Sequence, residues 1–344
     1  MNNWFSFTDN EKYEVIRYTA DKMGFSDVVI EKDWWVCMVL RAVFQSKYRE
    51  LIVFKGGTSL SKAYNIIERF SEDVDLIIDR YFLGFEDATS KTQIKKLRKN
   101  AGTFVINDFR KELILQLQNL GISDKTFSIE YNENVDDTSD PNQLELYYHS
   151  VVPSQNHIQK KIIIEMGARA LSEPSEIQKI NSYIDQNFKD RDFTFTDFEV
   201  NVIVPTKTFL EKIFLLHEEF TKPTEKIRFD KLSRHLYDLE KITHTAYAEN
   251  ALNDNELFQT IADFRKVMNN VKGISFENHE KGKINIIPPD EVLHKWENDY
   301  KLMQQNMIVG DSLSFSELIE KIKALQNKIN GNTLCIPIYF IDIE

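Results

Sequence analysis

The sequence predicts an α/β core followed by a helical C-terminal part. Five stretches have the length and apolar pattern of strands: residues 51–54, 73–78, 127–131, 144–148 and 161–166. From about Pro205 onward, the apolar residues recur at helical spacing instead. A chain of 344 residues exceeds the usual size of one domain. We therefore expect two domains, residues 1–200 with the core and residues 201–344 with the helices.

The first fifty residues have the pattern of two helices. Thr8 opens a capping-box pattern, and Gly24 ends the helix that follows it. Residues 29–44 form a second helical stretch that is nearly all apolar. We expect its two tryptophans, Trp34 and Trp35, to be buried against the core.

A glycine turn and an acidic strand form the most informative stretch. The turn Lys55-Gly56-Gly57 follows the first strand, and a helical pattern then leads to Asp73 and Asp75 on the second. Alternate residues of a strand share a face, so the two carboxylates lie side by side. Because they repel each other, they need a cation, and their oxygen ligands suit Mg²⁺. The paired glycines let the backbone approach a ligand, and the following helix offers amides to phosphate. The stretch predicts a site for a nucleoside triphosphate and its metal, rather than a tight loop beside a solvated acidic pair.

The middle of the sequence combines a long helix with short strands. Residues 92–120 have the apolar spacing of one helix, which Gly121 ends. An acidic loop near residue 140 separates the strands that follow. Glu165 is the only acid in the last of these strands, and a buried carboxylate needs a partner. A salt bridge to Arg169 is one explanation.

Two predicted helices of the C-terminal part carry charged residues beside their apolar faces. The segment 173–192 is polar, and we expect a helix there that joins the two lobes. In the first C-terminal helix, Lys212 lies at the edge of the apolar face. In the predicted helix 229–242, Arg234 and Asp238 are four residues apart and face each other. Taken alone, these patterns indicate that Lys212 is a solvated lysine and that Arg234 and Asp238 form a local ion pair.

Composition describes an ordinary soluble globular protein, with 42% hydrophobic and 28% charged residues. Its two cysteines, Cys37 and Cys335, lie in apolar surroundings without partner spacing, so we expect them to be reduced. Polar residues interrupt the N-terminus, and no apolar run approaches the roughly 20 residues of a membrane helix. These observations predict a cytoplasmic protein with no membrane segment. The seven histidines lack ligand spacing, and neither a P-loop nor a Gly-x-Ser-x-Gly elbow occurs.

Charge is unevenly distributed along the chain. The net charge of −11 argues against indiscriminate nucleic-acid binding. Residues 91–111, however, hold seven basic side chains and one acid, whereas residues 130–145 hold six acids and no base. A local basic face on an acidic body could select one RNA. The alternative is a solvated helix flank.

The run FKGGTSLSKAYNIIERFSEDVDLII resembles motif one of the AbiEii-type nucleotidyltransferase toxins. That family lies within the polymerase β-like nucleotidyltransferase superfamily, whose pattern is a glycine pair, a helix and then Asp-x-Asp. Fifteen residues separate Gly57 from Asp73, which resembles the AbiEii-like branch with its longer helix. Thr58 keeps the hydroxyl of the usual Gly-Ser. The runs KTFLEK and RHLYDL resemble two later motifs, with Lys207 in place of an Arg and His235 where many members have Asp.

The resemblance implies a fold and a site. The fold would be a polymerase β-like nucleotidyltransferase core with a mixed sheet, plus the helical C-terminal domain. Asp73 and Asp75 would hold Mg²⁺, and Glu165 could be a third metal acid, so two explanations stay open for that residue. Lys212 would contact the triphosphate, where a point charge suits phosphate, and Asp238 would lie near the base or the attacking hydroxyl. The nucleotide-binding candidates are Gly56, Gly57, Thr58, Ser71 and Lys212, and the catalytic candidates are Asp73, Asp75, Lys212 and Asp238.

The resemblance also implies an activity and partners. A nucleoside monophosphate would pass from an NTP to an acceptor, namely RNA and above all tRNA. The protein would be the toxin of a toxin–antitoxin or phage-defence (abortive infection) pair, with an antitoxin as its partner. Two other functions stay open: a small-molecule nucleotidyltransferase of the antibiotic-modifying type, and a non-catalytic nucleotide-binding protein. A small antitoxin gene immediately upstream would favour the toxin.

Overall fold

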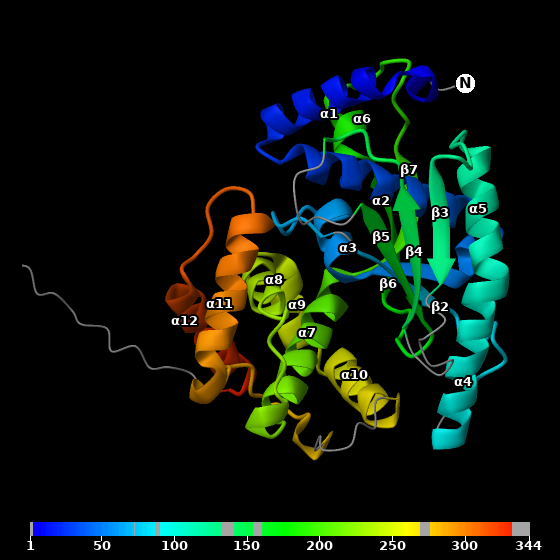
Figure 1. Ribbon diagram of the computed structural model, residues 1–344. Helices are drawn as coiled ribbons and strands as arrows, with labels where there is room; N and C mark the ends of the chain where they lie inside the picture. Colours follow the sequence, from blue (N-terminus) through cyan, green and yellow to red (C-terminus); the bar gives the residue numbers. More distant parts are fainter. Residues whose placement is uncertain are drawn as a thin grey trace, which may run out of the picture. The chain divides into compact units, whose positions relative to one another are not determined.

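The computed structural model describes residues 3–71, 73–86, 90–131, 141–153, 160–268 and 276–331. The chain forms two compact units, which Figure 1 colours along the sequence. The first unit comprises Met1–Thr208, Val267–Asn269 and Met307–Asp311, and the second comprises Phe209–Lys266, Asn270–Asn306 and Ser312–Glu344. Residue 200, the expected domain boundary, lies inside a strand, and the first unit continues to Thr208.

The first unit contains a seven-stranded sheet. The strands are β1 Ile52–Lys55, β2 Asp73–Ile78, β3 Phe127–Tyr131, β4 Asn142–Tyr148, β5 Lys161–Gly167, β6 Ser175–Ile180 and β7 Phe198–Ile203. Their order in the sheet is β3-β4-β5-β2-β1-β7-β6. β2 pairs with β5, and β1 with β7, in parallel, whereas the other neighbours are antiparallel. The predicted mixed sheet is confirmed, and the five predicted strands are all present.

Helices cover the apolar face of this sheet. α2, Asp27–Gln45, is buried over almost its whole length and contacts β2, β5 and β7; in Figure 1 it crosses behind the strands. Its two tryptophans are buried, as predicted. α1, Asp9–Met23, packs against α2 and has both predicted ends, the capping box at Thr8 and Gly24 in the left-handed conformation.

The predicted long helix contains one π-helical turn. α4 Lys91–Phe104, the π-helical η3 Val105–Phe109 and α5 Arg110–Asn119 follow one another without a break. Gly121 lies just beyond this run, as predicted, with a φ of +100°. Four lysines of α4 are exposed: Lys91, Lys95, Lys96 and Lys99. The basic stretch is therefore a solvent-facing surface of the first unit.

The predicted helix after the glycine turn is shorter than its apolar spacing indicates. α3 spans Gly56–Lys62 and stops there. Downstream, the backbone N–H of Phe70 donates to the Met307 carbonyl at 2.7 Å, and that of Val309 donates to the Glu68 carbonyl at 3.1 Å. The extra residues between the glycines and the acidic strand thus form a loop that pairs with a segment far along the chain. This distant partner overrides the local helical pattern.

The segment 173–192 is not the predicted linking helix. It contains β6, which pairs with β7 along its whole length, and only α6, Tyr183–Asn187, is helical. β6 lies at an edge of the sheet, where polar side chains protect an exposed strand. The prediction was wrong because pairing with β7 decides the conformation of β6, and the alternating run FEVNVI of β7, which is a strand signal, was missed.

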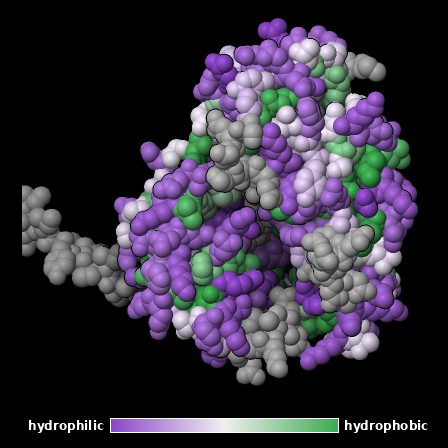
Figure 2. Space-filling view, in the orientation of Figure 1, coloured by the Kyte–Doolittle hydropathy of each residue, from purple (hydrophilic) through white to green (hydrophobic). Residues whose placement is uncertain are grey.

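The second unit is helical, as predicted. α7, Pro205–Phe220, begins in the first unit and continues in the second. The other helices are α8 Arg234–Thr243, α9 Ala246–Asn253, α10 Asn255–Met268, α11 Asp290–Asn306 and α12 Phe315–Ile329. α8 begins later than predicted, because the backbone N–H groups of Lys231 and Ser233 instead donate to Asp299, at 2.7 and 2.9 Å. In Figure 2 the visible surface over α11 and α12 is mostly hydrophilic, since their apolar stripes are buried.

Short 3-10 helices complete the described chain: η1 Asn3–Ser6, η2 Arg49–Leu51, η4 Thr224–Lys226 and η5 Phe276–Asn278. The acidic loop expected near residue 140 lies outside the described residues. Within the described ranges, no helix combines the length and apolar character that crossing a membrane requires.

Candidate active site

The glycine turn lies directly against the acidic strand. β1 and β2 are antiparallel neighbours, and Lys55 is opposite Asp75 in their register. Gly56 has a φ of +85°, and a Cβ atom there would collide with Oδ2 of Asp75. Both the conformation and the space therefore require glycine at this position. Gly56 therefore allows the backbone of the turn to contact the Asp75 carboxylate.

Three of the other nucleotide-binding candidates, Gly57, Thr58 and Ser71, gather at the same place. A Cβ atom on Gly57 would lie 2.5 Å from a guanidinium nitrogen of Arg69 and 3.2 Å from Oγ of Ser71. The Thr58 hydroxyl donates a hydrogen bond to the Asp73 carbonyl at 2.5 Å. The first turn of α3 is thereby fixed to the start of β2. Arg69, which was not among the predicted site residues, is buried within this cluster.

Three carboxylates share one face of the sheet at this point. Asp75 on β2 is opposite Glu165 on β5, and Asp73 lies two residues before Asp75 on the same face. Burial raises the pKa of Glu165, and the negative charges of Asp75 and Asp73 raise it further. The side-chain amide of Gln143 donates to Glu165 at 2.5 Å. Arg169, the alternative partner, donates to the Met268 carbonyl at 3.4 Å.

The donor chemistry of these carboxylates suits a hard cation. Carboxylate oxygens are the ligands that Mg²⁺ takes in proteins, and the mutual repulsion of the three acids favours positive charge between them. Among the described residues, no group of three or more His, Cys, Asp or Glu side chains is already gathered as a metal site. Mg²⁺ in proteins is usually held by one or two carboxylates together with water and substrate phosphates, which the pair Asp73 and Asp75 could supply.

Lys212 and Asp238 form an ion pair within the second unit. Nζ of Lys212, on α7, lies 2.8 Å from Oδ2 of Asp238, on α8, and 3.3 Å from Nδ1 of His235. The Asp238 side chain is fully buried and that of Lys212 is 8% exposed. The view of Lys212 as a solvated surface lysine is therefore wrong. A common site for these residues and Asp73, which belongs to the first unit, stays a prediction.

Sequence reasoning missed a second buried pair, which supports the turn. Nζ of Lys62, the last residue of α3, lies 2.7 Å from Oδ1 of Asp33 on α2, and both side chains are almost fully buried. Oδ2 of Asp33 accepts a hydrogen bond from the Tyr183 backbone at 2.7 Å. Two charged residues inside a nearly apolar helix, Glu31 and Asp33, were the available signal. Their charges could be read from the sequence, but their partners could not.

Replacing Gly56 by Ala should destabilise the protein more than the same change at Gly84. Gly84 has almost the same φ, +84°, but no atom lies within 4 Å of the position that a Cβ would take there. Gly84→Ala therefore carries only the cost of the left-handed conformation, roughly 1–2 kcal/mol. Gly56→Ala should cost about 1–3 kcal/mol more, because the Asp75 carboxylate must move. Urea unfolding of both variants measures the difference, and equal costs would contradict the described contact.

Replacing Lys212 by Ala should be destabilising, by up to about 3–5 kcal/mol, because the fully buried Asp238 would lose the ammonium that lies 2.8 Å from it. The double variant Lys212→Met, Asp238→Asn removes both charges and should lose markedly less stability. Urea unfolding of the two variants gives the comparison. A single variant as stable as the unaltered protein would show that the ion pair does not persist in solution.

Comparisons with known proteins identify the family. The family model for the nucleotidyl transferase AbiEii toxin of type IV toxin–antitoxin systems matches residues 39–321. A comparison with curated proteins gives no match. A solved structure, MenT4, a nucleotidyltransferase toxin from Mycobacterium tuberculosis H37Rv, is similar with a TM-score of 0.41 and 15% identity, over 95% of this chain and 99% of that one. Because the family model spans most of the chain, the protein belongs to the AbiEii family and is a nucleotidyltransferase toxin of the type IV toxin–antitoxin class, which implies a cognate antitoxin.

Proposed function

We propose that this toxin transfers a nucleoside monophosphate from an NTP to an RNA acceptor, with tRNA as the first candidate, and that the reaction depends on Mg²⁺. The observation that carries the proposal is the contact between the Gly56 backbone and the Asp75 carboxylate, with Asp73 and Glu165 on the same face. This arrangement supports the binding of a polyphosphate chain and its cation close to the backbone of the turn.

The chemistry requires positioning and charge neutralisation. An acceptor hydroxyl loses its proton and attacks the α-phosphorus of the NTP, the bond from that phosphorus to the α,β-bridging oxygen breaks, and pyrophosphate leaves. When bound, Mg²⁺ supplies the positive charge that the phosphates need in the transition state. Asp73 and Asp75 are the proposed ligands of the metal, with Glu165 as a third. Gly56 and Gly57 are the proposed nucleotide-binding glycines, because they let Asp75 on one side and Arg69 with Ser71 on the other lie against the turn that the phosphates would meet.

Roles for the second unit are carried over from the family motifs. Lys212 is the proposed contact to the triphosphate. Its buried ion pair with Asp238 fixes the direction of the ammonium, so Asp238 would act mainly through Lys212. A role for Asp238 at the acceptor hydroxyl remains the alternative, and the effect of Asp238→Asn on NTP binding separates the two.

An RNA acceptor is supported by the exposed lysines of α4. Lys95, Lys96 and Lys99 are exposed on one short stretch, and Lys91 begins the same helix. A polyanion gains affinity from such a surface by releasing counterions, whereas a small uncharged acceptor would not. Incubation with each labelled NTP and either total RNA or small-molecule acceptors tests the acceptor class directly. Label found only in small molecules would exclude the RNA acceptor.

Asp73→Asn should reduce nucleotide transfer to RNA by about 100-fold or more. The reason is the loss of one charged metal ligand, and a loss of several kcal/mol of transition-state stabilisation corresponds to such a factor. Asp79→Asn makes the same change beyond the other end of β2 and should leave the rate nearly unchanged. Chelation of Mg²⁺ by EDTA should abolish transfer in the unaltered protein. Undiminished transfer by a folded Asp73→Asn protein would rule out the proposed role.

Replacing Lys95, Lys96 and Lys99 together by Gln should weaken RNA binding and flatten its salt dependence. Each lost phosphate contact lowers the log–log salt slope by about 0.7 to 0.9, so the slope should fall by roughly 2 to 3. Arg98 is half-buried and is left in place. The matched control replaces three lysines of α12, Lys321, Lys323 and Lys328, by Gln. An equal change of the salt slope in both triple variants would mean that the α4 lysines make no particular contact with RNA and that α4 is only a solvated helix flank.

A further inference from the structure

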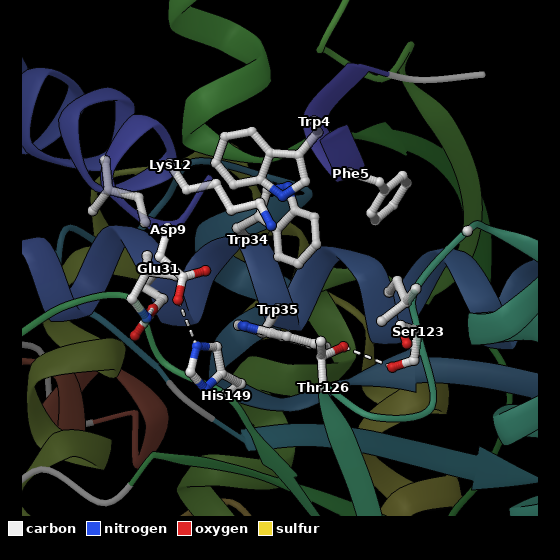
Figure 3. Close-up of a pocket in the computed structure, with 14 residues that line it drawn as sticks. Trp4, Phe5, Asp9, Lys12, Glu31, Trp34, Trp35, Ser123, Thr126 and His149 are labelled. Atoms are coloured by element: carbon white, nitrogen blue, oxygen red, sulfur yellow. Dashed lines mark hydrogen bonds and ion pairs between the residues drawn. The ribbon is translucent and has the colours of Figure 1, made fainter. Parts of the chain in front are cut away.

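The first unit contains a hollow that the glycine turn and the carboxylates do not line. We call it the tryptophan pocket, because its walls include Trp4, Trp34 and Trp35, together with Phe5 (Figure 3). It has a volume of about 130 Å³. Its lining comes from η1, α1, α2 and the loops that follow α5 and β4.

The rings of the pocket are held in fixed positions. The ring centroids of Trp4 and Trp34 are 5.4 Å apart, and those of Trp34 and Trp35 are 5.2 Å apart with planes at 89°. Tyr148 stacks on Trp35 at 5.0 Å. The three indoles are each only 4–6% exposed, so packing fixes their orientation. A rigid hollow with aromatic walls suits a planar ring, which would contact the small part of each indole that the packing leaves open.

Polar groups at the pocket include both donors and acceptors. Oδ2 of Asp9 and Nε2 of His149 lie 2.9 Å apart, and Lys12 extends toward the rings from α1 (Figure 3). Glu31 lies at the pocket and accepts hydrogen bonds from the Val151 backbone and the Ser150 hydroxyl, both at 2.7 Å. Two carboxylates disfavour a phosphate group inside, and the Lys12 ammonium disfavours a cation. A nucleobase, planar and neutral with donors and acceptors on its edge, fits this chemistry.

The pocket lies at the same end of the sheet as the carboxylates. Asp73 is opposite Ile163 on β5, and Ile163 is opposite Glu145 on β4. Tyr148, which stacks on Trp35, lies three residues beyond Glu145 on β4 and therefore on the opposite face of the sheet from Asp73, so an RNA strand that reaches both sites would pass round the end of the sheet. With a rise of about 3.3 Å per residue and strands about 4.8 Å apart, Tyr148 is roughly 14 Å from Asp73. This separation exceeds one nucleotide but is bridged by a few linked ones.

We propose that the tryptophan pocket binds one unstacked base of the RNA acceptor, a few nucleotides from the hydroxyl that reacts. The identification of the ligand as the acceptor rests on the proposed function. Proteins that bind single-stranded RNA commonly stack splayed-out bases on aromatic side chains, and each stacked base strengthens binding. The exposed lysines of α4, in the same unit, would contact phosphates elsewhere along the same strand.

Intrinsic fluorescence gives a direct readout, because three of the four tryptophans line the pocket. The fourth, Trp296, is fully buried in the second unit. In a Trp296→Phe protein without NTP, a short single-stranded RNA should quench the emission, whereas an abasic strand of equal length and charge should not. If Trp296→Phe does not fold, the unaltered chain serves equally, with Trp296 as a constant background.

Filling the pocket provides the matched test. Ser123 is exposed on the lining, and Ser123→Phe should weaken binding of the RNA about 5- to 150-fold, the equivalent of one lost stacked base. Ser128→Phe makes the same change at an exposed position of β3 outside the lining and should bind normally. The KM for RNA in the transfer assay should rise by the same factor in Ser123→Phe.

Several results would overturn the inference. Equal quenching by the base-containing and abasic strands would mean that no base enters. Equal quenching by NTP alone would assign the pocket to the substrate nucleotide. Quenching by an aromatic peptide, with RNA inert, would assign it to a protein partner.

The transfer assay separates failure of this inference from failure of the proposed function. Normal RNA labelling by Ser123→Phe with an unchanged KM would show that the RNA does not use the pocket, while leaving the proposed function intact. Base-dependent quenching without any RNA labelling would instead refute the proposed function and, with it, the acceptor as ligand.

Discussion

The buried ion pair between Asp33 and Lys62 holds the site in place. α3 has seven residues, too few for a stable helix without tertiary contacts, and Lys62 is its last residue. Burial alone would lower the pKa of Lys62, but the carboxylate of Asp33 more than compensates and raises it, so the ammonium stays charged. The Tyr183 ring covers Lys62 at 4.0 Å. Loss of either charge would leave the other buried alone, at a cost of about 3–5 kcal/mol, and would free α3.

The same helix anchors the pocket and the turn. Asp33 and Glu31 lie two residues apart on α2, and each accepts a backbone hydrogen bond from another segment, Asp33 from Tyr183 at the start of α6 and Glu31 from Val151 in the loop after β4. Burial raises the pKa of Glu31, while the hydrogen bonds from Ser150, Val151 and Val152 lower it. One acid thus fixes α3 and the glycines that begin it, and the other fixes the loop beside Trp35. α2 is the element through which a base in the tryptophan pocket and a nucleotide at Gly56 would be kept at a constant separation.

The sequence patterns correctly predicted the features that depend on residues close together in the sequence. The bounds of β2, the capping box at Thr8 and the burial of Trp34 and Trp35 follow from periodicity and capping chemistry within a few residues. The end of α3 does not, since it depends on the pairing of Glu68 and Phe70 with a segment more than two hundred residues later. The strand β6 likewise depends on a partner strand rather than on its own polar sequence. Within the site, the glycines and both aspartates could be found from the sequence, whereas the partners of Asp33 and of Lys212 depend on tertiary packing.

The cluster of three carboxylates adds unfavourable electrostatic free energy to the folded protein at one place. Burial above all, and then the negative charges of Asp75 and Asp73, raise the pKa of Glu165, and the Gln143 amide and the Lys55 charge offset only part of that rise. The contact with Gly56 prevents Asp75 from being displaced by a side chain on the turn. Such a cluster lowers the stability of the free protein and is relieved by any cation that binds between the acids. If the proposed metal–nucleotide complex binds here, relief of this repulsion would contribute to its binding free energy, at the expense of the stability of the free protein.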